Sequence, residues 1–101
     1  MKKIQLTIYL NEADMLGDVP LHEGVVRRLL HFAVAGATVT PGLMGYGKHG
    51  KVHRKRLFGV SDDRPVVITA IDDEARLRAI LPEIRGMLPE ALMTFHDVEI
   101  P

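Results

Sequence analysis

The chain has 101 residues, of which 47% are hydrophobic and 26% are charged, and it carries 13 basic and 13 acidic side chains. This balance is typical of one folded domain, and a net charge of zero gives no reason to expect nucleic acid as a partner. The absence of cysteine excludes disulfides, thiolate metal sites and cysteine nucleophiles. Since no apolar run approaches the ~20 residues of a membrane-spanning helix and no signal sequence follows the basic N-terminus, we expect a cytoplasmic protein.

The first part of the chain predicts a strand followed by a helix. Residues 3–10 alternate between apolar and polar side chains, which is typical of a strand with one buried face. Residues 11–18 are polar and predict a loop. Pro20 suits the first turn of a helix, and apolar residues follow at helical spacing. We expect this helix to end near Ala35, with Gly36 as its stop.

The middle of the chain predicts two strands separated by an unpatterned segment. Residues 37–43 are rich in threonine and valine, but Pro41 cannot donate a ladder hydrogen bond, so this strand should lie at an edge or carry a bulge. Residues 45–64 show no period and form the most glycine-rich and basic stretch. Residues 65–71 are apolar on both faces, which favours a central strand covered on both sides.

The last part of the chain predicts a second helix and a fourth strand. Asp72 and Asp73 are candidates for the N-cap of the helix. Apolar residues continue at helical spacing as far as Leu88, and Pro82 within them predicts a kink or a break and restart. Residues 92–100 alternate again and predict a strand.

The order strand–helix–strand–strand–helix–strand predicts a single domain over residues 1–101 with an α+β fold. Right-handed crossovers then give a ferredoxin-like βαββαβ plait: a four-stranded antiparallel sheet with two helices on one face. The other face of the sheet would still present apolar side chains from residues 65–71, together with Tyr9. Because such a patch on a small protein usually marks an interface, we expect a homo-oligomer.

The segment around residues 45–56 is the candidate ligand-binding site. Its glycines leave backbone N–H groups free to approach an anion, and its cations add positive charge. The spacing also matches parts of the dinucleotide fingerprint and of the P-loop, but Val52 stands where a P-loop needs Ser or Thr. The candidate residues are Gly45, Gly47, Lys48, His49, Gly50, Lys51, His53, Arg54 and Arg56.

Three interpretations of this segment remain open on the residues alone. In the first, it binds an anionic small molecule, with the histidines as protonatable helpers. In the second, the chain is a small enzyme that acts on a phosphorylated or carboxylated substrate, with His49 or His53 as acid and base. In the third, the segment is a solvated loop of a ligand-free interaction module. We expect no metal here, since five neighbouring cations oppose a divalent ion.

Several motifs resemble the domain-of-unknown-function 190 family, in order over nearly the whole chain. The residues that carry this resemblance are Leu6-Thr-Ile-Tyr-Leu10, Pro20-Leu21, Ala35-Gly-Ala-Thr-Val39, Gly45-Tyr-Gly-Lys-His-Gly50 with His53 after it, Pro65-Val-Val67, Leu81-Pro82 and Asp97-Val-Glu99. That family is similar to the PII signalling proteins, which have a ferredoxin-like fold.

The resemblance implies a non-enzymatic, trimeric regulatory protein. It implies that residues 45–56 occupy the position of the mobile loop of PII proteins. An adenine nucleotide (ATP, ADP, AMP or cyclic AMP) would then bind in clefts between subunits. The resemblance further implies a membrane transport or channel protein as the partner that the loop contacts. The glycine- and lysine-rich turn that PII proteins carry before their last strands has no counterpart in this sequence.

Overall fold

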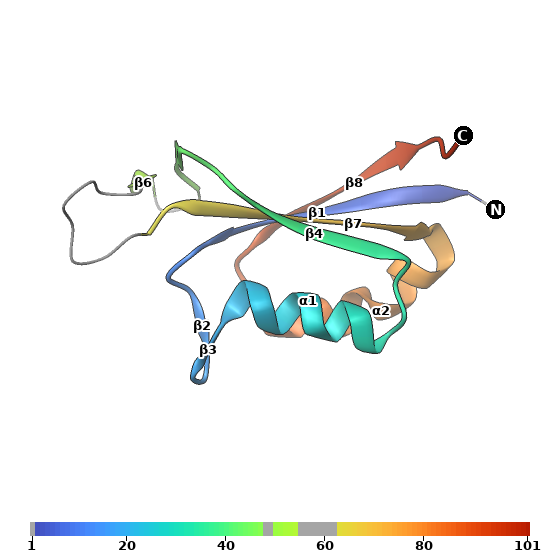
Figure 1. The fold of residues 1–101 in the computed structure, drawn as a ribbon, viewed down its shortest axis with the longest axis horizontal. Helices are drawn as coiled ribbons and strands as arrows, with labels where there is room; N and C mark the ends of the chain where they lie inside the picture. The colour runs from blue at the N-terminus through green and yellow to red at the C-terminus, as the bar shows by residue number, and fades with distance from the viewer. Residues whose placement is uncertain (1, 48–49, 55–62) are drawn as a thin grey trace.

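The computed structural model describes residues 2–47, 50–54 and 63–101, and it contains the predicted four-stranded sheet (Figure 1). The order of the strands is β4-β7-β1-β8, and each neighbouring pair is antiparallel. The bounds are β1 Lys3–Asn11, β4 Gly36–Pro41, β7 Pro65–Asp73 and β8 Leu92–Val98, with helices α1 Leu21–His31 and α2 Glu74–Met87. Both helices lie on one face, so the predicted α+β ferredoxin-like plait is confirmed.

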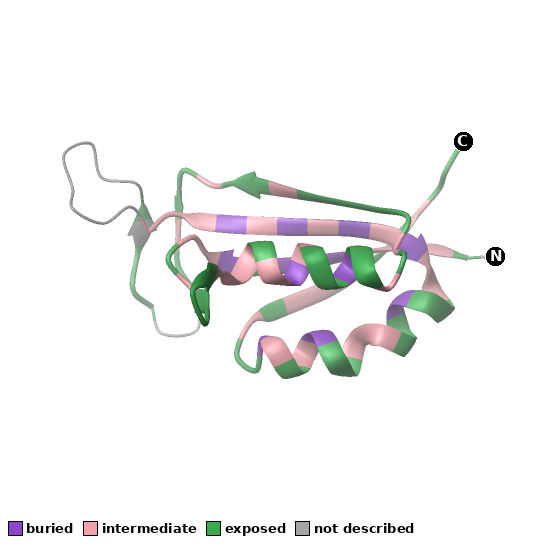
Figure 2. Ribbon diagram, turned by 60° about the horizontal axis from the view of Figure 1, so that its bottom comes forward, coloured by how far each residue is buried: buried purple, intermediate pink, exposed green. Residues whose placement is uncertain are grey.

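The hydrophobic core lies between this face of the sheet and the helices. Residues of β7 alternate between buried and half-buried along the strand, as Figure 2 shows. The buried residues come from β1, β7 and the inner sides of both helices, together with Leu88: Ile4, Leu6, Ile8, Leu10, Val25, Leu29, Val66, Ile68, Ala70, Leu77, Ile84 and Leu88. Val67, Thr69 and Ile71 of β7 point to the other face, which no described helix covers. Strand β7 is therefore central, as predicted, but the helices of the described residues cover it on one side only.

The first helix ends four residues earlier than the sequence predicts. The N–H of Ala33 donates to the carbonyl of Leu30, and the N–H of Val34 donates to the carbonyl of Leu29, at 2.9 and 3.1 Å. These two bonds form a Schellman motif, which closes a helix through a left-handed residue. Ala33 takes that position with φ 58°, although glycine is the usual residue there. The predicted stop at Gly36 is wrong, because Gly36 already pairs with Ile71 in the sheet.

The two aspartates before α2 do not cap it with their side chains. Asp73 occupies the N-cap position, but its carboxylate lies 2.5 Å from Nζ of Lys3 and makes no capping bond. This hydrogen bond and the charge of Lys3 hold the pKa of Asp73 below its usual value of 3.8. The carboxylate of Asp72 is buried and accepts a hydrogen bond from the N–H of Ala35 at 3.0 Å. The predicted N-cap position is thus confirmed for Asp73, but neither side chain caps the helix, because both carboxylates have partners far away in the sequence.

Two prolines mark the limits of what the pattern predicts. Pro41 ends β4, and β4 is an edge strand, as predicted. Helix α2 continues through Pro82, so the predicted break and restart does not occur. The expected loop at residues 11–18 includes β2, Met15–Leu16, which pairs with β3, Val19–Pro20, through a turn in which Gly17 has φ +62°.

None of the helices in the described residues is long and apolar enough to span a membrane.

Candidate functional site

The glycine-rich segment leaves the sheet as a two-stranded ribbon at the end opposite the chain termini (Figure 1). Strand β5, Met44–Gly45, pairs with β6, His53–Arg54, so that Met44 lies opposite Arg54 and Gly45 lies opposite His53. Residues 45–64 were expected to be unpatterned, and β6 is the exception. The pairing brings residues 44–45 and 53–54 together and fixes where the ribbon begins.

The base of the ribbon is held against the first residue of β7. The N–H of Gly42 donates to the carbonyl of Pro65 at 2.8 Å. A Cβ atom at Gly42 would lie 2.9 Å from Cγ of Pro65, and a Cβ atom at Gly45 would lie 3.4 Å from it. Because the first of these distances is shorter than real Cβ contacts, only glycine fits at position 42 without a shift of the proline ring. The glycine at this position therefore serves the close approach of two backbone segments.

A second set of contacts joins the start of β7 to the end of β1. The N–H of Glu12 donates to the carbonyl of Arg64 at 2.8 Å, and Nε of Arg64 lies 3.1 Å from Oε2 of Glu12. The N–H of Ala13 donates to Oδ1 of Asp63 at 3.1 Å. Arg64 is thus paired with an acidic side chain, although the sequence groups it with the cations of the loop. Its role is to hold the loop base and not to offer a free charge.

The ribbon contains two exposed glycines that a backbone hydrogen bond joins. The N–H of Gly50 donates to the carbonyl of Gly47 at 2.9 Å, and Gly50 has φ +69°, a conformation that favours glycine. Both glycines are exposed, and no atom lies within 4 Å of a Cβ built on either of them. An anion can therefore approach the backbone here without a steric barrier.

Two of the predicted cations can be placed on this ribbon. Lys51 and Arg54 are exposed, and neither forms an ion pair with another described residue. His53 is described only by its backbone pairing in β6. Lys48, His49 and Arg56 lie outside the described residues, and so does much of the loop whose mobility the family resemblance implies. The described part of the site therefore consists of two exposed glycines followed by two exposed positive charges.

The ribbon also exposes large apolar side chains, and the sequence does not predict their exposure. These residues, with their exposed fractions, are Leu43 at 92%, Met44 at 59%, Tyr46 at 76% and Val52 at 51%. Their signal in the sequence is weak, because single apolar residues without a period cannot be assigned to the core or to the surface. Their exposure adds an apolar character to a segment that is otherwise basic.

The described residues do not indicate a metal centre. No three histidine, aspartate or glutamate side chains in residues 2–47, 50–54 and 63–101 come together in a way that could hold an ion. The exposed glycine backbone and the two cations of the described site are groups that can bind an anion.

Solved structures of similar fold belong to PII-like and CutA proteins. CPII from Thiomonas intermedia K12, a nitrogen regulatory PII-like protein bound to ADP, AMP and bicarbonate, matches with a TM-score of 0.74 and 22% identity over 99% of this chain and 89% of CPII. CutA1 from Oryza sativa matches with a TM-score of 0.68 and 11% identity, over 100% and 84% of the two chains. At these identities the comparison shows a common fold.

Relatives by sequence extend over nearly the whole chain. A UPF0166 protein of Aquifex aeolicus (strain VF5) is 32% identical over 100 residues, which cover 99% of this chain and 94% of the relative. A UPF0166 protein of Methanocaldococcus jannaschii is 33% identical over 79 residues, or 78% and 72% of the two chains. The model of the domain-of-unknown-function 190 family, described as Uncharacterized ACR, matches residues 3–100. This chain therefore belongs to the domain-of-unknown-function 190 family.

Proposed function

We propose that this chain is a cytoplasmic PII-like regulatory protein without enzymatic activity of its own. It binds an adenine nucleotide (ATP, ADP, AMP or cyclic AMP) in clefts between subunits, beside the base of the glycine-rich ribbon. Binding changes the order of the loop and so its fit to a partner, which we infer to be a membrane transport or channel protein. The candidate residues Lys48, His49, His53 and Arg56 take part together with the described glycines and cations.

The observation that carries the proposal is the pair of exposed glycines followed by two cations that form no ion pair with a described residue, in a PII-like fold. Phosphate groups are bound by backbone N–H groups and by Lys or Arg. In the described ribbon, Lys51 and Arg54 offer exposed cations and Gly47 an exposed backbone, while the N–H of Gly50 already donates to the carbonyl of Gly47. CPII, which has a similar fold, binds ADP and AMP, and this supports an adenine nucleotide as the ligand. The ribbon base is fixed on Pro65, so a ligand there could reorder the loop without disturbing the sheet.

Assembly into a trimer is part of the proposal, and the open face of the sheet supports assembly. On this face, side chains that lie opposite one another on neighbouring strands form rows, and the central rows cross all four strands. One row contains only threonines, Thr38, Thr69, Thr7 and Thr94, and the next contains Thr40, Val67, Tyr9 and Leu92. Tyr9 is 45% exposed and Leu92 is 64% exposed in the single chain. A second and third copy of the chain would cover these side chains, and closed symmetry would leave no free apolar face.

Nucleotide binding is tested by calorimetry with ATP, ADP, AMP and cyclic AMP on the wild type and on Lys51→Ala and Arg54→Ala. Each variant removes one charge-assisted hydrogen bond, so binding should weaken by about 1–3 kcal/mol. Arg27→Ala is the matched control, because Arg27 is also an exposed cation but lies on α1, paired with Glu23. Higher salt should weaken binding as well, since exposed charges are screened within ~10 Å at 0.1 M.

The outcomes of this experiment separate the three interpretations of the segment. If no nucleotide binds the wild type, the ligand proposal is wrong and the interaction module remains. If a bound nucleotide is turned over at enzyme-like rates, and the turnover is lost in His49→Ala or His53→Ala, the chain is an enzyme. Tight binding without phosphate release is the result that we expect.

The trimer is tested by sedimentation at micromolar concentration. Val67→Glu places a charge in the apolar row of the open face and should give a folded monomer. Leu30→Glu is the control, because Leu30 is 75% exposed on α1, on the side of the sheet that carries the helices. A wild type that sediments as a monomer would contradict the proposal. Whether the nucleotide controls partner contact is then measured as nucleotide-dependent binding of the trimer to membranes that contain the channel.

A further inference from the structure

The second helix leaves part of an edge strand uncovered and so creates a cavity. Helix α2 packs over β1 and β7, the two central strands, while β8 lies beyond them at the edge of the sheet. Met93 and Phe95 of β8 point to the helix side but remain half-buried. The space between α2 and β8 has a volume of about 260 Å³ and is lined by Leu6, Leu81, Pro82, Arg85, Met93, Thr94 and Phe95.

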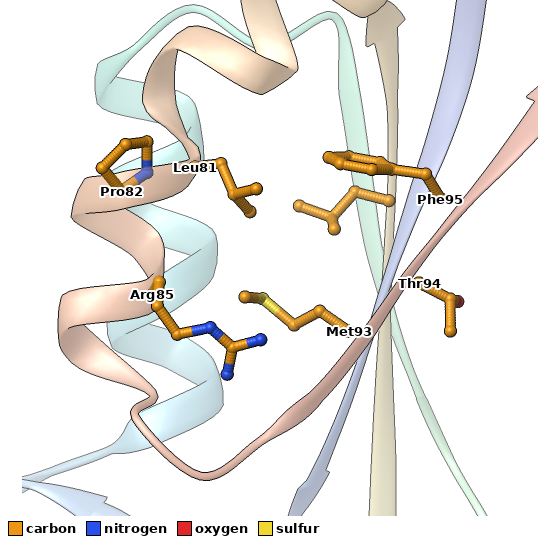
Figure 3. Close-up of a pocket in the computed structure, with 7 residues that line it drawn as sticks. Leu81, Pro82, Arg85, Met93, Thr94 and Phe95 are labelled. Atoms are coloured by element: carbon orange, nitrogen blue, oxygen red, sulfur yellow. The ribbon is translucent and has the colours of Figure 1, made fainter.

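The walls of this cavity are apolar, with a single charged side chain. Figure 3 shows Leu81 and Arg85 extending from α2 and Met93 and Phe95 extending from β8 into the same space. Thr94 points to the far side of its strand. A cavity of this composition would hold an apolar group, and Arg85 supplies the only group that can bind a charge.

The guanidinium group of Arg85 is fixed in place but only partly used. Its Nη1 atom donates to the carbonyls of Leu88 and Ala91, at 2.9 and 2.7 Å. Within the described residues, Arg85 has no carboxylate partner, and no hydrogen bond uses Nε or Nη2. These donors are therefore free for a carboxylate, and the orientation of the group costs little on binding.

A second arginine, Arg78, contacts Phe95 but does not line the cavity. Its guanidinium carbon lies 4.7 Å above the ring of Phe95. Its Nε atom donates to Oε2 of Glu74 at 2.8 Å, so this charge is already paired. An anionic group in the cavity would therefore be attracted to Arg85.

We propose that this cavity binds a small amphipathic carboxylate, an unbranched aliphatic acid. Its chain lies between Leu81, Met93 and Phe95, where the burial of CH₂ groups favours binding. Its carboxylate accepts hydrogen bonds from the free donors of Arg85. The site is separate from the glycine-rich ribbon, because that ribbon follows β4, at the opposite edge of the sheet from β8. The inference therefore does not depend on nucleotide binding.

The test is titration of the ¹⁵N-labelled wild type with octanoate, with octan-1-ol and acetate as the neutral and the chain-free controls. We expect saturable octanoate binding, with amide shifts confined to α2 and β8 and affinities at least tenfold lower for both controls. Arg85→Gln should weaken octanoate at least fivefold and leave octan-1-ol unchanged. Arg27→Gln, a cation on the other helix, should change neither.

A second variant keeps the test valid if Arg85→Gln fails to fold without its bonds to the carbonyls of Leu88 and Ala91. Leu81→Phe fills the cavity and keeps the arginine, so octanoate binding should be lost while the protein remains folded. The proposal is wrong if millimolar octanoate produces no saturable shifts, or if octan-1-ol binds as tightly as octanoate. It is also wrong if Leu81→Phe alters the sedimentation of the protein while octanoate fails to bind, since a second copy of the chain would then fill the cavity.

Discussion

Among the charged side chains, that of Asp72 should contribute the most to the free energy of unfolding of this protein. It is 6% exposed, and its carboxylate makes three contacts. Oδ2 accepts from the N–H of Ala35 at 3.0 Å and lies 3.3 Å from Nε of Arg76, while Oδ1 accepts from the N–H of Asp73 at 2.6 Å. These contacts tie the turn after α1 to the start of α2, two regions that are far apart in the sequence.

The size of the effect follows from these contacts. Asp72→Ala leaves partly buried N–H groups without their charged acceptor, which costs about 1–3 kcal/mol. The half-exposed ion pair with Arg76 adds at most about 1 kcal/mol, so the total loss should be about 1–4 kcal/mol. For a chain of this length, that corresponds to a fall in Tm of about 5–20 °C. Asp72→Asn keeps one acceptor oxygen and should lose about half as much free energy.

The measurement is urea unfolding followed by far-ultraviolet circular dichroism, because the chain has no tryptophan. All variants are compared at one protein concentration, since assembly raises the apparent stability. Asp97→Ala is the control: its side chain is 78% exposed, and its ion pair with Lys2 should contribute less than about 1 kcal/mol. If Asp72→Ala unfolds at the same urea concentration as Asp97→Ala, the buried carboxylate does not tie the two regions together.

Three further changes follow from the backbone and the charges. Gly42→Ala should destabilise the fold by about 1–3 kcal/mol, because its Cβ would meet the ring of Pro65 at 2.9 Å. Gly86→Ala, where a Cβ meets nothing, should instead add about 0.5–1 kcal/mol in the same unfolding assay. Ala33→Gly should raise stability by about 0.5–1 kcal/mol, since φ 58° strains alanine more than the added chain entropy of glycine costs; an unchanged midpoint would show that the strain is absent. The pKa of Asp73 is lowered in the folded state, so its stabilising effect is present above pH 3.8 and is lost as the pH falls through the folded value. In an acid titration followed by circular dichroism, the stability of Asp73→Asn should therefore depend less steeply on pH than that of the wild type. The same pH dependence in both proteins would contradict the pairing of Asp73 with lysine.

The sequence predicts the architecture of this protein because the burial of one face of a strand or helix produces a periodic pattern of apolar residues along it. The alternation at residues 3–10 places Ile4 and its partners on the core side of β1, and Pro41 predicts an edge strand. Gly50 has φ +69°, a conformation that favours glycine, but the ligand-binding role of the glycines in the candidate site stays a prediction. The roles of Lys48 and His49 in that site stay predictions, because both lie outside the described residues.

The tertiary structure alone decides which partner each polar side chain finds. Asp72 and Asp73 have the spacing of helix caps, yet their carboxylates bind Ala35 and Lys3, which other strands and turns bring close. Arg64 looks like one of the loop cations in the sequence, but Glu12 neutralises it at the end of β1. The cavity beside β8 has no sequence pattern either, because it depends on where α2 crosses the sheet. Periodicity records which face of an element is buried, and it carries no information about which distant residue lies opposite.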